Sequence, residues 1–200
     1  MGLVRKKTPE PEELEQEQPS TADLLAQLDD PDPDRRREAA LGLDGVAEAV
    51  GPLLDRVAQE EEAAVRDAIL TTLAAHDTDE VAAGLAVHLA TDEAGLRTAV
   101  AEALATMPVS TPAIIPRLIQ DPDHDVRVMT AMVLADLPHP ASLTWLAEMI
   151  RDDTHPNVVA SAIDALLPSI GPEHTELLER AVRRFPNDPF LRFTVEAALR

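Results

Sequence analysis

Apolar and polar positions repeat along this chain at an interval of about thirty residues. Six positions, here called the anchors, mark the repeat: Arg36, Arg66, Arg97, Arg127, Val159 and Arg192. The residues one before, three after and seven after each anchor are mostly aliphatic, and the last of the three is leucine in every unit. Because these offsets lie on one face of a helix, each anchor is predicted to begin a helix that buries an aliphatic stripe.

A second apolar segment precedes each of these helices, as in "TADLLAQL", "TPAIIPRLI" and "HTELLERAV". Polar stretches such as "DDPDPD", "QDPDHD" and "RFPNDP" separate the two segments. Pro and Asp are expected to end the first helix, and Asp or Asn to cap the second. Each unit is therefore predicted to be a helix–turn–helix, and such units must stack into a solenoid to bury their apolar faces.

Composition agrees with an all-α fold that has an aliphatic core. Hydrophobic residues make up 45% of the 200-residue chain, but aromatic residues only 2%, and runs typical of strands are missing. The chain has no cysteine, which excludes disulfides, thiol nucleophiles and zinc–thiolate sites. No segment has the length and hydropathy of a signal peptide or a membrane span, so we expect a cytoplasmic protein without a membrane partner.

The formal net charge of −20 narrows the range of partners. Such a surface repels nucleic acids and anionic membranes, and it indicates either simple solubility or a basic protein partner. Residues 1–19 are predicted to be a disordered acidic tail, either solubilising or docking, and residues 20–200 to be a single repeat domain.

The stretches "IIPRLIQDPDHDVRVMTAMVLADL" (114–137) and "LLAQLDDPDPDRRREAALGL" (24–43) resemble the HEAT repeat, in the short bacterial form known from phycobiliprotein lyase-like proteins. The resemblance covers about six units. It implies a right-handed superhelical α-solenoid whose second helices line a concave surface. It also implies a ladder of Asp and Arg side chains between neighbouring repeats.

Asp121, Asp123 and Asp125 have the spacing of the first ligands of a calcium loop. However, Val126 stands where that loop needs glycine, and Met132 stands where it needs glutamate. The same spacing recurs in the first unit at Asp30, Asp32 and Asp34, which favours a structural joint over a metal site. The predicted ladder residues are Arg36, Arg66, Arg97, Arg127, Arg192, Asp121 and Asp123, and Val159 is expected to interrupt the ladder.

The sequence offers little to support catalysis. No histidines lie four residues apart, and no His-Glu-x-x-His motif is present. Deoxyhypusine hydroxylase, a metalloenzyme on a similar scaffold, uses paired His-Glu dipeptides, but no histidine here is followed by glutamate. HEAT-like alkyl-DNA glycosylases present a basic face with aromatic residues, whereas this chain is acidic and has one Trp. We therefore expect a non-enzymatic protein with no catalytic residue, metal or cofactor.

The second helix of each unit has another face, which points away from the aliphatic stripe. The residues predicted to line it and meet a partner are Asp67, Thr98, Glu102, Val128, Met129, Met132, Asp136 and Asp164. Val128, Met129 and Met132 would form either an exposed apolar patch with an acidic rim or a buried contact between neighbouring helices. The first alternative predicts a scaffold or adaptor that binds a basic or partly apolar protein segment.

The lyase resemblance implies a second function, that of an accessory subunit or chaperone-like factor in attaching a bilin to a protein. The irregular spacing of the repeats argues against a third possibility, a designed repeat without a partner.

Overall fold

The computed structural model describes residues 19–199, and within this range the chain forms six pairs of α-helices. We call the first helix of each pair the A helix and the second the B helix. The A helices are α1 (Thr21–Gln27), α3 (Val50–Val57), α5 (Asp79–Ala86), α7 (Thr111–Leu118), α9 (Ser142–Asp152) and α11 (Thr175–Arg184). The B helices are α2 (Pro33–Gly42), α4 (Ala63–His76), α6 (Ala94–Ala105), α8 (His124–Asp136), α10 (Pro156–Leu166) and α12 (Pro189–Ala198).

Short 3₁₀ segments adjoin four of the helices, at Ala47–Ala49, Val87–Ala90, Leu167–Ser169 and Pro172–His174. The residues predicted to cap and begin helices do so in the structure. The side chains of Asp32 and Asp123 cap α2 and α8, and proline occupies the first turn of α2, α10 and α12.

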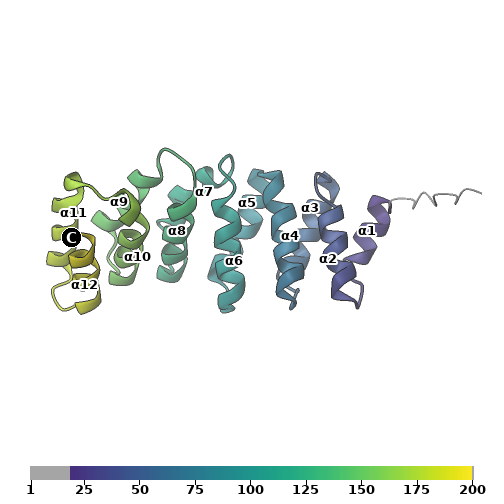
Figure 1. Cartoon of the computed structure of the whole chain (residues 1–200), viewed down its shortest axis with the longest axis horizontal. Coiled ribbons are helices and arrows are strands. Elements are labelled where there is room, and N and C mark those ends of the chain that lie inside the picture. The colour runs from purple at the N-terminus through teal and green to yellow at the C-terminus, as the bar shows by residue number, and fades with distance from the viewer. Residues whose placement is uncertain (1–18, 200) are drawn as a thin grey trace, which may run out of the picture.

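The pairs stack in chain order into an elongated solenoid (Figure 1), so the all-α repeat architecture is confirmed. B helices α2, α4, α6 and α8 stand side by side in one row, and A helices α3 and α5 lie behind them. Neighbouring B helices pack against each other more extensively than neighbouring A helices do. This is the packing expected when the B helices line the inner side of a curved stack.

The core consists of the predicted aliphatic stripes. Three residues after each anchor, the side chain is at most 4% exposed in every unit, including Thr130, whose hydroxyl donates to the carbonyl oxygen of Val126. Seven residues after each anchor, the leucine is at most 2% exposed in the first five units. Leu199, in the sixth, is 42% exposed, because within the described residues no further helix packs beyond α12.

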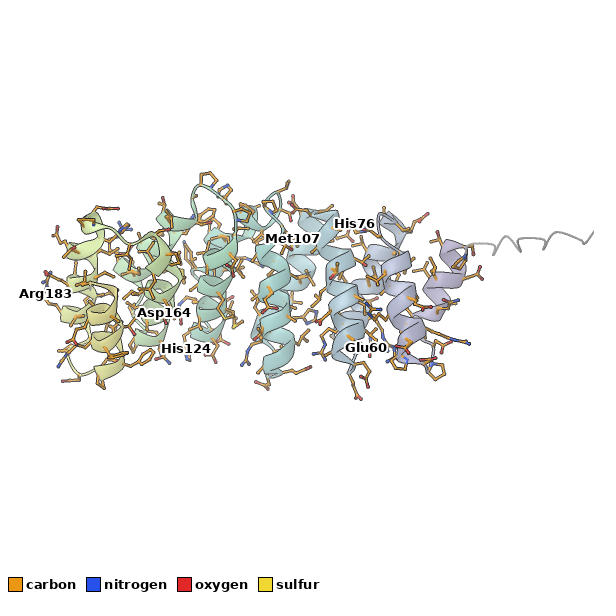
Figure 2. All side chains as sticks on the ribbon, viewed as in Figure 1. Glu60, His76, Met107, His124, Asp164 and Arg183 are labelled. Carbon is orange, nitrogen blue, oxygen red and sulfur yellow. The ribbon has the colours of Figure 1, made fainter. Side chains whose placement is uncertain are left out.

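The two edges of the stack carry different connections. Glu60, in the turn between α3 and α4, and His124, the first residue of α8, lie along one edge (Figure 2). His76, the last residue of α4, and Met107, two residues after α6, lie along the opposite edge. None of the described helices is long and apolar enough to cross a membrane. The predicted acidic tail, residues 1–19, lies almost entirely outside the described residues.

Candidate interaction surface

Each arginine anchor fastens its own B helix to the turn that precedes it. The guanidinium groups of Arg36, Arg97 and Arg127 donate to the carbonyl oxygen six residues earlier in the chain, at 2.9, 2.7 and 2.8 Å. Arg66 and Arg192 make the same bond. Because these carbonyls follow the last turn of an A helix, the bonds fix the angle between the two helices of a pair.

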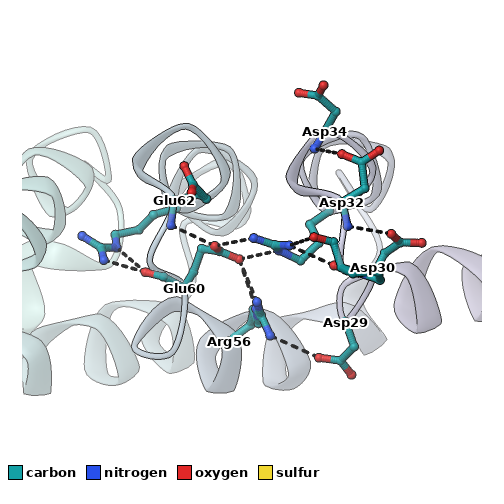
Figure 3. Close-up of polar contacts among 10 residues, drawn as sticks. Asp29, Asp30, Asp32, Asp34, Arg56, Glu60 and Glu62 are labelled. Atoms are coloured by element: carbon teal, nitrogen blue, oxygen red, sulfur yellow. Dashed lines mark hydrogen bonds and ion pairs between the residues drawn. The ribbon is translucent and has the colours of Figure 1, made fainter.

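The joint between the first two pairs is built around Glu60, a residue of the turn between α3 and α4 (Figure 3). Its carboxylate accepts two hydrogen bonds from Arg36 of the preceding pair, at 2.8 and 2.9 Å, and a further bond from Arg56 at 2.9 Å. The backbone N–H of Glu62 donates to it as well, at 3.0 Å. Only 1% of the Glu60 side chain is exposed, so these protein donors take the place of the water molecules that would otherwise hydrogen-bond to the carboxylate.

Burial alone would raise the pKa of Glu60. The hydrogen bonds from Arg36, Arg56 and the Glu62 N–H outweigh that effect and lower the pKa to about 2. The same carboxylate raises the pKa of Arg36 above its ordinary value. The pair is therefore ionised at neutral pH, and it holds the first two repeats in one relative position.

The same construction returns in the second half of the stack. Arg127 donates to both carboxylate oxygens of Asp153, at 2.7 and 3.1 Å, and the Asp153 side chain is 5% exposed. The backbone N–H of His155 completes the set at 2.8 Å. In the second repeat, Arg66 instead meets the half-exposed Glu93 at 2.7 Å, since Thr91 stands at the position equivalent to Glu60.

Two joints depart from this pattern. Among residues 19–199, no carboxylate lies within ion-pair distance of Arg97, although Asp121 stands at the position equivalent to Glu60. At Val159 the interruption is partial, because Arg184 from α11 donates to the carbonyl oxygens of Ile150, Arg151 and Asp153. A side chain from the following repeat thus holds the turn that Val159 cannot reach.

The alternating aspartates hold backbone groups, so the prediction that Asp121 and Asp123 pair with anchor arginines in a ladder is wrong: among residues 19–199, neither forms an ion pair with an arginine. The carboxylate of Asp121 accepts from the N–H of Asp123, and that of Asp123 from the N–H of Asp125, both at 2.9 Å. Asp30 and Asp32 repeat these two bonds in the first unit. Within the described part of the chain, no group of three His, Asp or Glu side chains is arranged to hold a metal ion.

Several histidines also act on the backbone. The Nδ1 atoms of His139, His155 and His174 accept a backbone N–H from a residue two or three positions away in the sequence. His124 stacks on His155 across neighbouring turns, with ring centroids 4.0 Å apart.

The B face, which we define as the side of the B helices turned away from the A helices, exposes less of the predicted apolar patch than the sequence allowed. Met129 was a candidate for an exposed apolar patch, but it is only 7% exposed, so the alternative of burial between helices is right for this residue. The position two residues after the anchor points sideways, toward the neighbouring B helix, and is buried or half-buried in every unit except the first. Val128 is half-buried against the core, whereas Met132 is 40% exposed.

The remaining predicted lining residues lie on the surface. Asp67, Thr98, Glu102, Asp136 and Asp164 are all exposed. They do not form one cluster, because they come from four successive B helices. Partial burial raises the pKa of the Asp164 carboxyl above its ordinary value.

A single offset describes the B face better than the predicted set. The residue five positions after the anchor is exposed in all six units, which gives the row Leu41, Thr71, Glu102, Met132, Asp164 and Ala197. Thr71, which the predicted set lacks, also lines a groove between α4 and α6. The joints likewise contain unpredicted members, Arg56, Glu60, Asp153 and Arg184. Glu60 and Asp153 were detectable, because both stand six residues before an anchor as Asp121 does.

Comparison with protein families gives a match to the model for HEAT repeats over residues 21–105 and 111–200. The chain belongs to the HEAT-repeat family. The two matched segments together span all six helix pairs, so the HEAT assignment covers the joints and the B face alike.

Other comparisons give only distant similarities. No curated protein matches the sequence. Among solved structures, the chain is similar to human deoxyhypusine hydroxylase in complex with glycerol, at 18% identity and a TM-score of 0.43, covering 90% of this chain and 83% of that one. It is also similar to an engineered protein, at 17% identity and a TM-score of 0.38, covering 90% of this chain and 94% of the other.

Proposed function

We propose that this HEAT-repeat protein is a non-enzymatic scaffold that binds a protein partner across its B face. The observation that carries the proposal is the row of exposed side chains at one offset on all six B helices. HEAT repeats commonly mediate protein interactions. A fixed row on rigid helices suits recognition, because little conformational entropy is lost when a partner binds.

The joints support the same proposal. The ion pairs and carbonyl bonds lie at the A–B edge of the stack, where they set the spacing of neighbouring B helices. The B-face row is therefore presented on a preformed frame. An exposed methionine in that row, Met132, is suited to an apolar contact because its side chain adapts in shape.

A matched pair of variants tests which face is used. Met132 on α8 is 40% exposed, and Leu143 on the A helix α9 is 46% exposed. We expect Met132→Asp to remove specific proteins captured from a native lysate, and Leu143→Asp to leave them in place. Both proteins should first show the wild-type unfolding transition. If the two variants capture the same set of proteins as the wild type, the B-face proposal is wrong.

The bilin-attachment alternative is a separate prediction that rests on the lyase resemblance. A shift in visible absorbance on mixing the chain with free bilin would support it, and no shift would remove it.

A further inference from the structure

A groove with a volume of about 410 Å³ lies between α4 and α6 on the B face. Small and apolar side chains line it, among them Leu70, Ala99 and Ala103. Two carboxylates, Asp67 of α4 and Glu102 of α6, also line the groove, and both residues are exposed. The lining can therefore accept an aliphatic stem that ends in a positive charge, which is the form of a Lys or Arg side chain.

Beyond the groove, the exposed row continues with Met132 on α8 and Asp164 on α10. Glu102, Met132 and Asp164 stand at the same offset on successive helices, so charged, apolar and charged side chains alternate across the stack. Packed helices lie about 8–10 Å apart, which gives roughly that separation between neighbours in the row.

No cation on α4, α6, α8 or α10 neutralises the row, although the exposed Arg37 of α2 lines a neighbouring groove that shares Asp67. The only Lys or Arg residues of α4, α6, α8 and α10 are Arg66, Arg97 and Arg127, and all three bond to the carbonyl oxygens of their own turns. Partial burial raises the pKa of the Asp164 carboxyl, as expected for a partly dehydrated carboxylate.

We propose that this part of the B face binds an extended basic segment of a partner protein. One Lys or Arg side chain enters the groove between Asp67 and Glu102, an apolar side chain lies on Met132, and a second Lys or Arg pairs with Asp164. This inference rests on the proposed scaffold function and specifies the partner's chemistry.

The helix spacing sets the order of side chains in the segment. An extended chain advances about 3.3 Å per residue, so it crosses one helix in about three residues. The groove lies between α4 and α6, about one and a half helix spacings from Met132. Alternate side chains of an extended chain face the same way, so the segment should place its apolar residue about four positions after the first cation and its second cation two or four positions later.

The test uses a labelled synthetic peptide with Arg, Leu and Arg at these spacings and Gly or Ser elsewhere, titrated with the full chain. We expect saturable binding that weakens as salt rises. The double variant Glu102→Gln, Asp164→Asn should weaken binding by about tenfold, since each exposed charge pair contributes a few-fold to affinity. The matched control, Asp55→Asn with Glu176→Gln on the A helices, removes the same charges and should bind as the wild type does.

The outcomes separate this inference from the scaffold proposal. Equal weakening in both double variants would show attraction to the overall negative charge and would overturn the inference. So would equal binding of a peptide with the same composition in scrambled order. If no basic peptide binds while Met132→Asp still abolishes capture of a specific protein, the scaffold proposal stands and the inference that the partner segment is basic is wrong.

Discussion

The joints at Glu60 and at Asp153 both fix the position of neighbouring repeats, but they use different residues. In both, a carboxylate in the A–B turn accepts a paired hydrogen bond from the preceding anchor arginine and a backbone N–H from its own turn. They differ in the second arginine. Arg56 contacts the Glu60 carboxylate from the same repeat, whereas Arg184 reaches the Asp153 carbonyl from the next one.

The difference teaches that an arginine can hold an A–B turn from more than one position in the sequence. Where Val159 replaces an anchor arginine, Arg184 on α11 supplies donors to the same turn. A buried ion pair adds little net stability compared with a well-packed apolar contact, but it strongly disfavours any position in which its partners separate. We therefore regard these joints chiefly as devices that fix how neighbouring repeats sit.

The largest effect should come from deleting the more buried carboxylate. Glu60→Ala leaves the guanidinium groups of Arg36 and Arg56 without their partner, and we expect the free energy of unfolding to fall by about 3–5 kcal/mol. Asp153→Ala removes the partner of Arg127 alone and should cost less.

Urea unfolding followed by circular dichroism measures both changes. The exposed neighbour Glu61 is the control, because Glu61→Ala should change stability by less than about 0.5 kcal/mol. A similar loss in Glu60→Ala and Glu61→Ala would contradict the assignment of Glu60 as the centre of the joint.

Acid should weaken the same joint without any mutation. Because the pKa of folded Glu60 is lowered from 4.5 to about 2, its ionised form contributes its full stabilisation above pH 4.5. That contribution, of the order of 3 kcal/mol, is lost as the pH falls from 4.5 toward 2.

The measurement compares wild type with Glu60→Gln by urea unfolding across this pH range. The stability difference between the two proteins should shrink as the pH falls, since protonation makes the wild-type side chain neutral as well. A difference that stays constant with pH would show that Glu60 is not ionised within the joint.

The smallest of these effects should come from the joint at Val159, where Arg184 takes the place of an anchor arginine. Arg184→Ala removes the donor to three carbonyl oxygens and should lower the free energy of unfolding by about 1–2 kcal/mol. Its neighbour Arg183 is 63% exposed and pairs with Glu179 on the surface, so Arg183→Ala should cost well under 1 kcal/mol. Equal costs in thermal or urea unfolding would mean that Arg184 does not hold the turn.

Most of the fold followed from periodicity. The stripe at three offsets identified the B helices and their buried faces, because the core requires apolar side chains at helical spacing and these recur in each unit. The capping role of Asp32 and Asp123 was predicted correctly, but the predicted ladder pairing of Asp121 and Asp123 with arginines was not, since their carboxylates hold backbone N–H groups two residues on.

The candidate surface was harder to predict. Helical spacing alone did not separate the second position after the anchor from the fifth, and the burial of Met129 depends on how closely the next B helix approaches. The role of Arg184 was equally hard to predict, because Arg184 lies about thirty residues from the turn it contacts and on an A helix, whereas the anchors lie on B helices.

The sequence by itself determined the helices, their caps, the aliphatic core and the repeat that joins them. Each of these depends on contacts within one unit or on a pattern shared by all units. Only the tertiary structure decided which acid each arginine meets, which side chains of the B helices remain exposed, and that Asp67 and Glu102 border one groove. Those outcomes depend on the distance and angle between repeats, which follow from the packing of the whole stack.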